Sequence, residues 1–512
     1  MSRASVRFGV VAASFAGIAV VCAWLVRPFD GGPAATDASA SVLYFQRIVA
    51  GRHLEAFVNA TPKPLLTLVY GGLHEVTGGW EAAAWASVLV TAAGIILAAE
   101  LVRRIAGPEA AVFAVIALVG SVAFLTETSL GLGLPWAFAL WLAAALALMR
   151  PEPRYGVAGV CLLLAALARQ ETFLFLAGAT AWLVWRQVRG PRPSRGAWLI
   201  LIGWLAIVVL AIHDLALAGD PLWWTKVAGI SAARQHVGSV LHVAHRNAAH
   251  LLGLLGLVAF GIIGGLVLIR SRSWLTFWGL AVMGPLVALF TLVLAWRGLA
   301  VLDRYFHPID LAVILSAAIG AGAVLGGLRR RAVGKRPSRL DRGMPAIGMA
   351  AAAILAVLLS MPFAPASGAA RRTIGAQADT ALRVASMAPI LREALRAIPA
   401  PDAPEPGPYR TPEPADLRVF VPRYEGHRLA ATLPASMSYL RWIDPGRVDL
   451  ANGYPAVGSL LYFDGLLQPG AVTPQTAALR PSTPTIVGGV RVVPVYVDAA
   501  RKIWVERIEA AP

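Results

Sequence analysis

Long runs of apolar residues, separated by short polar segments, fill most of the chain before its last 150 residues or so. Most runs approach the length of about 20 residues that a helix needs to cross a bilayer. They lack the alternation of a membrane β-strand, and in lipid only helices and closed barrels satisfy their backbone groups. The pattern therefore predicts an all-α polytopic membrane bundle of about eleven transmembrane helices. The apolar runs lie at residues 8–26, 82–101, 109–125, 135–149, 156–168, 171–187, 197–217, 249–270, 273–296, 306–328 and 343–363.

Two segments depart from this pattern. Residues 64–76 (PLLTLVYGGLHEV) are apolar but cover only about 13 residues, too few for a comfortable span. They are either re-entrant or a tilted helix that raises the count to about twelve. The stretch 156–187 is too long instead, because about 32 helical residues exceed the thickness of the bilayer core. Arg169 and Glu171 lie near its middle, and we expect the chain to fold back there.

The composition changes after the last apolar run. An amphipathic segment near 379–397 precedes a Pro-rich stretch at 399–414, and short strand-like pieces follow. We therefore divide the chain into three parts. The first is a transmembrane domain over 1–364, followed by a helix and Pro-rich linker over 365–415 and a small mixed or β-containing C-terminal domain over 416–512.

Composition supports lipid as the main solvent. The mean hydropathy is +0.66, 57% of residues are hydrophobic and only 14% are charged, against about a quarter charged in soluble domains. The net charge of +17 would suit nucleic acid, but the arginines cluster in short loops beside apolar runs, where positive charge sets orientation. Both cysteines, Cys22 and Cys161, lie in apolar runs, so we expect neither a disulfide framework nor a cysteine-based metal site.

The basic loops also predict topology. When the runs are assigned to alternate sides from a cytoplasmic N-terminus, the arginine-rich loops all fall inside, as the positive-inside rule requires. The first loop, over 27–63, and the C-terminal domain then lie on the extracytoplasmic side. Arginine greatly outnumbers lysine and alanine is abundant, which suggests a GC-rich bacterial genome. We therefore expect a multi-pass protein of a bacterial plasma membrane.

Charged residues near hydrocarbon depth are the first candidates for chemistry, because they are costly to place there. Arg169 and Glu171 should lie on the floor of a recess that opens outward, either as a structural ion pair or as part of a site. Glu127, in a short outer loop, is a further candidate.

The first outer loop supplies a second group. Tyr44 and its apolar neighbours recur at helical spacing, which predicts a juxtamembrane helix along the membrane surface. Asp37 lies just beyond the first span, and Lys63 stands between two prolines where the next apolar segment begins. A solvated helix with no function is the alternative interpretation.

A third group, Asp303–Pro308, leads into a late span from the outer side. Arg304 and Tyr305 could anchor the helix end at the membrane interface, or Arg304 could grip a phosphate with its guanidinium fork. The loop 218–248 adds several histidines, but they lack the spacing of a zinc protease. The sequence thus requires no cofactor and leaves a divalent metal open.

The order of these motifs resembles the GT-C superfamily of polyprenyl-phosphate-sugar glycosyltransferases, which includes protein mannosyltransferase-like and arabinosyltransferase-like enzymes. The resemblance covers about residues 1–330 and is loose. It rests on the acidic first loop, Lys63-Pro64-Leu65, Arg169-x-Glu171 and Arg304-Tyr305-x-x-Pro308. Many such families carry paired acidic residues in the first loop, whereas Asp37 is followed by Ala38.

The resemblance implies a membrane enzyme of the cell envelope that moves a sugar from a polyprenyl phosphate to a glycan, lipid or protein acceptor. It implies that Asp37 is the catalytic base for the acceptor hydroxyl. Lys63, Arg169 and Arg304 would stabilise the departing lipid phosphate. Glu171 or Glu127 would orient these cations or the sugar.

Two other classes stay open. A transporter or lipid flippase would place Arg169 and Glu171 along a path through the membrane, although such proteins often contain internal repeats and none is visible here. A non-catalytic protein of envelope assembly would use the C-terminal domain as a binding module.

Overall fold

The computed structural model describes part of the chain and groups it into two compact units. The first unit comprises Met1–Arg27, Ala84–Val209 and Ala228–Ile374, and the second comprises Pro28–Ala83, Leu210–Val227 and Gly375–Pro512. The predicted boundaries at 364 and 415 stay predictions. The described residues are 36–51, 62–190, 192–226, 240–271, 273–297, 305–333, 344–360, 364–396, 419–420, 442–443, 457–465 and 474–512.

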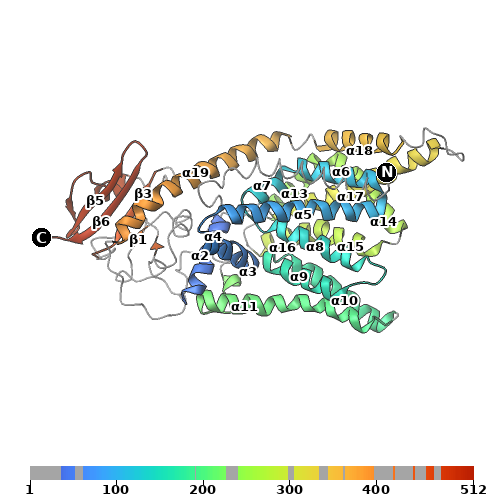
Figure 1. Ribbon diagram of the computed structural model, residues 1–512, viewed down its shortest axis with the longest axis horizontal. Helices are drawn as coiled ribbons and strands as arrows, with labels where there is room; N and C mark the ends of the chain where they lie inside the picture. The colour runs from blue at the N-terminus through green and yellow to red at the C-terminus, as the bar shows by residue number, and fades with distance from the viewer. Residues whose placement is uncertain are drawn as a thin grey trace. The chain divides into compact units, whose positions relative to one another are not determined.

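The first unit is helical (Figure 1). In each predicted apolar run after the first, the described residues are mainly helical. The run at 8–26 lies outside the described residues. The chain is thus a polytopic membrane bundle, as predicted, although its number of spans stays open. The elements are α5 (Glu81–Ala106), α6 (Pro108–Gly120), α7 (Val122–Ser129), α8 (Leu134–Leu148), α9 (Tyr155–Ala168), α10 (Thr172–Arg189), η3 (Arg195–Trp204), α11 (Leu205–Ala218), α13 (Val240–Gly253), α14 (Leu255–Arg270), α15 (Trp274–Ala281), η4 (Val282–Leu286), α16 (Val287–Trp296), α17 (His307–Val333) and α18 (Met344–Ser360). α5 and α11 also contribute residues to the second unit.

Length and hydropathy separate the helices into two groups. Four stretches within the described residues are long and apolar enough to cross a bilayer: Glu81–Ala106, Arg195–Ala218, Thr276–Trp296 and His307–Leu328. Shorter apolar helices accompany them, including α8 and α9. Large apolar side chains on these helices are exposed, among them Ile212 at 63% and Leu266 at 62%. Such surfaces are rare in water and suit a lipid environment.

Glycines let helices of the first unit approach closely. A Cβ at Gly320 of α17 would overlap the carbonyl oxygen of Phe260 in α14, and one at Gly264 of α14 would overlap that of Ser316. A Cβ at Gly322 would stand 2.6 Å from the Cβ of Ala110 in α6. These glycines therefore permit close packing, as expected for small residues between membrane helices.

The first described element of the second unit is α2 (Thr36–Val49), which confirms a helix in the first loop. Residues 64–77 form a second helix, built from α3 (Pro64–Leu66), the π-helical turn η2 (Thr67–Gly71) and α4 (Gly72–Thr77). The two pack so closely that a Cβ at Gly71 would overlap Phe45. Whether residues 64–76 enter the membrane stays open.

The C-terminal part of the second unit contains a sheet, which confirms that this region is β-containing, as predicted. Its strand order is β2-β1-β3-β6-β5-β4, with β1 parallel to its neighbours and the remaining pairs antiparallel. Leu461, Phe463, Val492 and Ile508 form its core with Leu479. The strands are β1 (Val419–Phe420), β2 (Trp442–Ile443), β3 (Leu460–Asp464), β4 (Thr485–Val487), β5 (Val490–Asp498) and β6 (Ile503–Ala510), and η13 (Pro474–Leu479) precedes β4.

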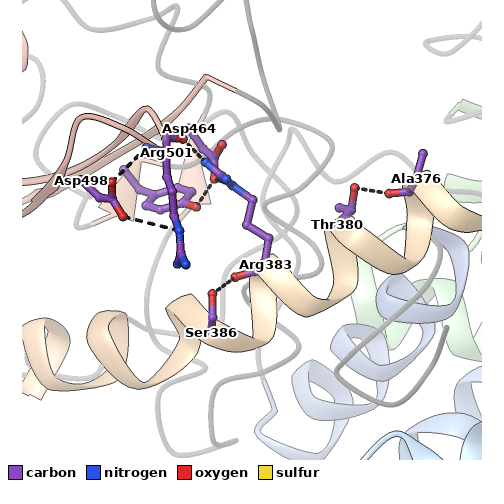
Figure 2. Close-up of polar contacts among 8 residues, drawn as sticks. Ala376, Thr380, Arg383, Ser386, Asp464, Asp498 and Arg501 are labelled. Atoms are coloured by element: carbon purple, nitrogen blue, oxygen red, sulfur yellow. Dashed lines mark hydrogen bonds and ion pairs between the residues drawn. The ribbon is translucent and has the colours of Figure 1, made fainter. Parts of the chain in front are cut away.

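The predicted amphipathic helix lies within α19 (Ala364–Arg396). From Gly375 onward this helix belongs to the same unit as the sheet. Arg383 extends from α19 to the end of β3, where its Nε donates to Asp464 at 2.6 Å (Figure 2). The guanidinium also donates to the carbonyl oxygen of Arg501, and the Tyr462 hydroxyl donates to the same Asp464 carboxylate at 2.7 Å. A charge-assisted contact therefore fixes the helix to the sheet.

Candidate functional site

The predicted break at residues 169–171 is present. α9 ends at Ala168, Arg169 has extended backbone with φ −149° and ψ 128°, and α10 begins at Thr172. The indole N–H of Trp141 in α8 donates to the Thr172 hydroxyl at 3.0 Å. A Cβ at Gly133, before α8, would lie 2.5 Å from the carbonyl oxygen of Ala168. A hydrogen bond from α8 and the close approach of the glycine just before α8 therefore hold this break in place.

Arg169 lies between two carboxylates. Its guanidinium holds Glu171 through two contacts, Nη2 to Oε1 at 2.6 Å and Nε to Oε2 at 3.2 Å. Glu127 Oε1 lies 3.7 Å from Nη1, and Tyr305 is close enough to interact electrostatically with the same guanidinium. Arg169, Glu171 and Glu127 are each less than a tenth exposed. Three of the predicted site residues thus come together in one buried cluster, and a fourth, the half-buried Tyr305, lies near it.

His307 belongs to the same cluster, although it was not a predicted site residue. It is the first residue of α17, and its Nδ1 lies 2.8 Å from Glu127 Oε1. When Glu127 is ionised its carboxylate can only accept, and the imidazole then donates through Nδ1–H. The one sequence signal for His307 was its place in the motif Asp303–Pro308. Its contact with Glu127 joins residues 180 positions apart, which no local pattern reveals.

Hydroxyl groups hold Glu127 in place. The helix α7 that carries it is tied to α5 by the Ser87 hydroxyl, which donates to the carbonyl oxygen of Thr128 at 2.9 Å. The hydroxyls of Thr91 and Thr128 also share a hydrogen bond of 2.9 Å. All three side chains are buried. Because buried polar contacts of this kind have few alternatives, α7 presents Glu127 to Arg169 from a fixed position.

The remaining predicted site residues have different outcomes. Asp37 lies in the first turn of α2, but its side chain is outside the described part of the structure. Lys63 precedes Pro64 and is half-buried. Both belong to the second unit, whereas the Arg169 cluster belongs to the first. Arg304 lies outside the described residues. The functional roles of all these residues stay predictions.

The α2 helix is more buried than a helix on a membrane surface would be. The polar residues Ser39, Ser41, Gln46 and Arg47 are buried, as are most of its apolar residues, although Val49 at its end is exposed. Gln46 Nε2 donates to Glu75 Oε1 in α4 at 2.9 Å. The first loop therefore contributes a packed polar helix.

The histidines of the loop 218–248 form no metal site that the structure describes. His242 and His245 are exposed on α13, and His236 is outside the described residues. No group of three or more His, Cys, Asp or Glu side chains suited to a metal ion is found among the described residues.

Two solved structures resemble this chain over nearly its whole length. ArnT from Cupriavidus metallidurans bound to undecaprenyl phosphate aligns with a TM-score of 0.59 over 98% of this chain and 99% of that one, at 14% identity. The same protein in the apo state aligns with a TM-score of 0.55 over 99% and 100%, at 15% identity. The chain has the fold of ArnT. The resemblance to the GT-C superfamily is thereby confirmed at the level of the fold.

No protein-family model matches the sequence, and no curated protein matches it. The likeness to ArnT is thus one of fold at low sequence identity. Because both alignments cover nearly all of this chain, they include the C-terminal region as well as the membrane helices.

Proposed function

We propose that this protein is an integral membrane glycosyltransferase that moves a sugar from a polyprenyl phosphate to an acceptor hydroxyl on the extracytoplasmic side of the plasma membrane. The observation that carries the proposal is the buried cluster of Arg169, Glu171, Glu127 and His307 at a helix break, in a chain with the ArnT fold. Three buried titratable groups joined by a half-buried histidine at membrane-helix ends mark a functional site by default. The ArnT structure with undecaprenyl phosphate supports a lipid phosphate as the class of donor.

The chemistry assigned to this chain is an inverting transfer. The acceptor oxygen attacks the anomeric carbon, the bond from that carbon to the phosphate oxygen breaks, and polyprenyl phosphate leaves with the electron pair. Asp37 takes the acceptor proton, which requires hydrogen-bond reach. Lys63 and Arg304 stabilise the negative charge that develops on the phosphate.

The contacts of Arg169 refine its proposed role. Two carboxylates already compensate its charge, one of them through a bidentate contact. A guanidinium held in this way has little charge left for a phosphate, so we assign it to fixing Glu171 and Glu127. Glu127 in turn orients His307. The cluster thus presents oriented polar groups, and Lys63 and Arg304 remain the phosphate ligands of the proposal.

Replacement of Asp37 tests the assignment of the base. Membranes bearing the Asp37→Asn variant are assayed for transfer from labelled polyprenyl-phosphate sugars, and we expect the rate to fall roughly 10²- to 10⁴-fold, the usual contribution of a general base. Asp220→Asn is the matched control, because Asp220 is an aspartate of the same unit that pairs with the exposed Lys226. Unchanged transfer by Asp37→Asn would remove Asp37 as the base.

The two rival classes make a different prediction for the parent protein. A flippase or transporter would move the lipid-linked sugar across the bilayer without breaking its bond to phosphate. An assembly protein would do neither. Absence of transfer by the parent with every donor offered would favour these classes.

A further inference from the structure

The end of α11 holds a buried histidine–aspartate pair that has no role in the proposed mechanism. His213 and Asp214 lie in the last turns of an otherwise apolar stretch that is long enough to cross a bilayer, Arg195–Ala218. His213 is 9% exposed and Asp214 is fully buried. Ionisable side chains at such a position are expensive, so their contacts indicate what they do.

Asp214 is fixed by the chain that follows its own helix. Gly219 adopts φ +67°, a left-handed conformation that glycine reaches without strain, and it ends the helix. The chain then turns so that the backbone N–H of Trp224 donates to Asp214 Oδ2 at 2.7 Å. The other carboxylate oxygen, Oδ1, lies 3.4 Å from His213 Nδ1. A carboxylate held by a backbone donor orients the imidazole beside it.

The imidazole connects this carboxylate to the helix that starts at Lys63. With the proton on Nδ1 toward Asp214, His213 Nε2 accepts from the Thr67 hydroxyl at 3.3 Å. Thr67 is one turn after Lys63, and its backbone N–H donates to the Lys63 carbonyl oxygen at 2.9 Å. A continuous chain of contacts thus runs from Asp214 through His213 and Thr67 to the backbone of Lys63.

The same imidazole also touches the helix that carries Asp37. The Tyr44 ring of α2 meets the His213 ring edge-on, with centroids 6.4 Å apart, and it meets the Trp223 ring in the same way at 6.2 Å. Tyr44 is 1% exposed, so this contact is fully packed. Three segments, α2, the Lys63 helix and the end of α11, therefore meet at one side chain.

An acid, an imidazole and a hydroxyl in this order also occur in nucleophilic triads. Here Thr67 is 3% exposed and lies within a helical turn, so its hydroxyl has no access to a substrate. Both contacts of the imidazole are longer than 3.2 Å. The contacts of Asp214, His213 and Thr67 are therefore better suited to holding the backbone at Thr67 in place than to catalysis.

We infer that His213, oriented by Asp214, is a positioning residue that sets the start of the Lys63 helix through Thr67 and so places the Lys63 ammonium for the lipid phosphate. The inference rests on the proposed function, because Lys63 is a phosphate ligand only within it. A lysine side chain is long and flexible. When the backbone of Lys63 is fixed, its ammonium group can reach a smaller region. Residues that support a binding site act on its ligand-contacting side chains in this way.

The first experiment separates donor binding from turnover. His213→Ala, His213→Gln and Thr67→Val are made in the full chain and assayed with a labelled polyprenyl-phosphate sugar. We expect His213→Ala and Thr67→Val to raise the half-saturating donor concentration roughly 10- to 100-fold, the range that a misplacement of about 1 Å can cause. Turnover at saturating donor should change less. Gln carries an amide oxygen that can accept from Thr67, so His213→Gln should recover most of the donor affinity.

Combining the two truncations tests whether they act through one contact. The double variant His213→Ala/Thr67→Val should be no worse than either single variant, because both remove the same interaction. Losses that multiply, or a lower turnover with an unchanged half-saturating concentration, would overturn the inference. If His213→Ala fails to fold, Thr67→Val and His213→Gln still carry the comparison.

A second readout does not require transfer. The labelling rate of Lys63 by a water-soluble amine reagent is followed by mass spectrometry in the same folded variants. We expect His213→Ala and Thr67→Val to change this rate and His213→Gln to restore it. An unchanged rate in both truncations overturns the inference. If the parent transfers no sugar but both truncations still change the labelling rate, the positioning of Lys63 is supported. That result would count against the proposed function alone.

Discussion

At the scale of single residues, the buried Arg169 cluster combines one guanidinium with two carboxylates and an imidazole. Such groups are stable out of water only when each charge has a partner. The cation is therefore the member that the cluster can least lose, because its removal leaves Glu171 and Glu127 facing each other. The close contact with Glu171 should contribute more than the 3.7 Å contact with Glu127.

These contacts predict an order of stabilities. Arg169→Met should lower the free energy of unfolding by about 3 to 5 kcal/mol, Glu171→Gln by less, and Glu127→Gln by least. Thermal unfolding of the purified variants in detergent measures the order. A more damaging Glu127→Gln than Arg169→Met would show that the cluster is not organised around the cation.

Glu506 predicts a pH dependence of the C-terminal sheet. It lies in β6 on the same face as Trp504 and Ile508, fully buried, and none of the described residues donates a hydrogen bond to its carboxyl oxygens. Burial raises the pKa of Glu506 from 4.5 to about 8. Because the folded state holds the proton more tightly, stability from this group is complete below pH 4.5 and falls as the pH rises toward 8.

Above pH 8, the Glu506→Gln variant should therefore be more stable than the parent and unfold at a higher temperature. The difference in free energy of unfolding should be at most roughly 5 kcal/mol. The two proteins should converge near pH 5. Tryptophan fluorescence of the full chain, which holds 16 tryptophans, follows the transition, and a Trp504→Phe version of each protein isolates the contribution of Trp504. Glu509→Gln on the same strand is the control, since Glu509 is partly exposed and faces Arg491 at 3.7 Å. A parallel pH dependence in parent and Glu506→Gln would contradict the assignment.

At the scale of elements, glycine contacts decide how α14 and α17 pack. Gly320→Ala places a methyl group against the Phe260 carbonyl oxygen and should destabilise the protein by about 1 to 3 kcal/mol, the usual cost of overpacking. Gly327→Ala on the same helix meets open space and should leave stability nearly unchanged or raise it slightly. Unfolding temperatures in detergent compare the two. Equal effects would contradict this packing.

The sequence predicts the helices well where their formation depends on local length and hydropathy alone. Run length and hydropathy indicate the helices, and the excess length of 156–187 indicates the break at Arg169. The burial of polar residues along α2 could not be predicted, because the helix that covers it lies beyond a loop. The overlap of Gly71 with Phe45 is likewise visible only once both helices are placed.

At the scale of the whole molecule, the order of motifs along the chain was enough to predict the fold, since ArnT shares it at 14% identity. Which residues meet at the site was harder to predict from the sequence. Glu127 and Arg169 were predicted separately, but neither their contact nor the role of His307 follows from sequence spacing. His213 and Asp214 were missed because they lie inside an apolar run that reads as an ordinary span.

The proposed reaction breaks the bond between a sugar and a polyprenyl phosphate. The most direct measurement compares membranes containing the protein with membranes lacking it. Each is supplied with an envelope acceptor fraction and either a labelled polyprenyl-phosphate sugar or the same sugar on a soluble nucleotide. We expect label to pass to the acceptor, and polyprenyl phosphate to be released, only with the lipid-linked donor and only when the protein is present. A lipid-linked donor that stays intact with every sugar offered would contradict the proposed reaction.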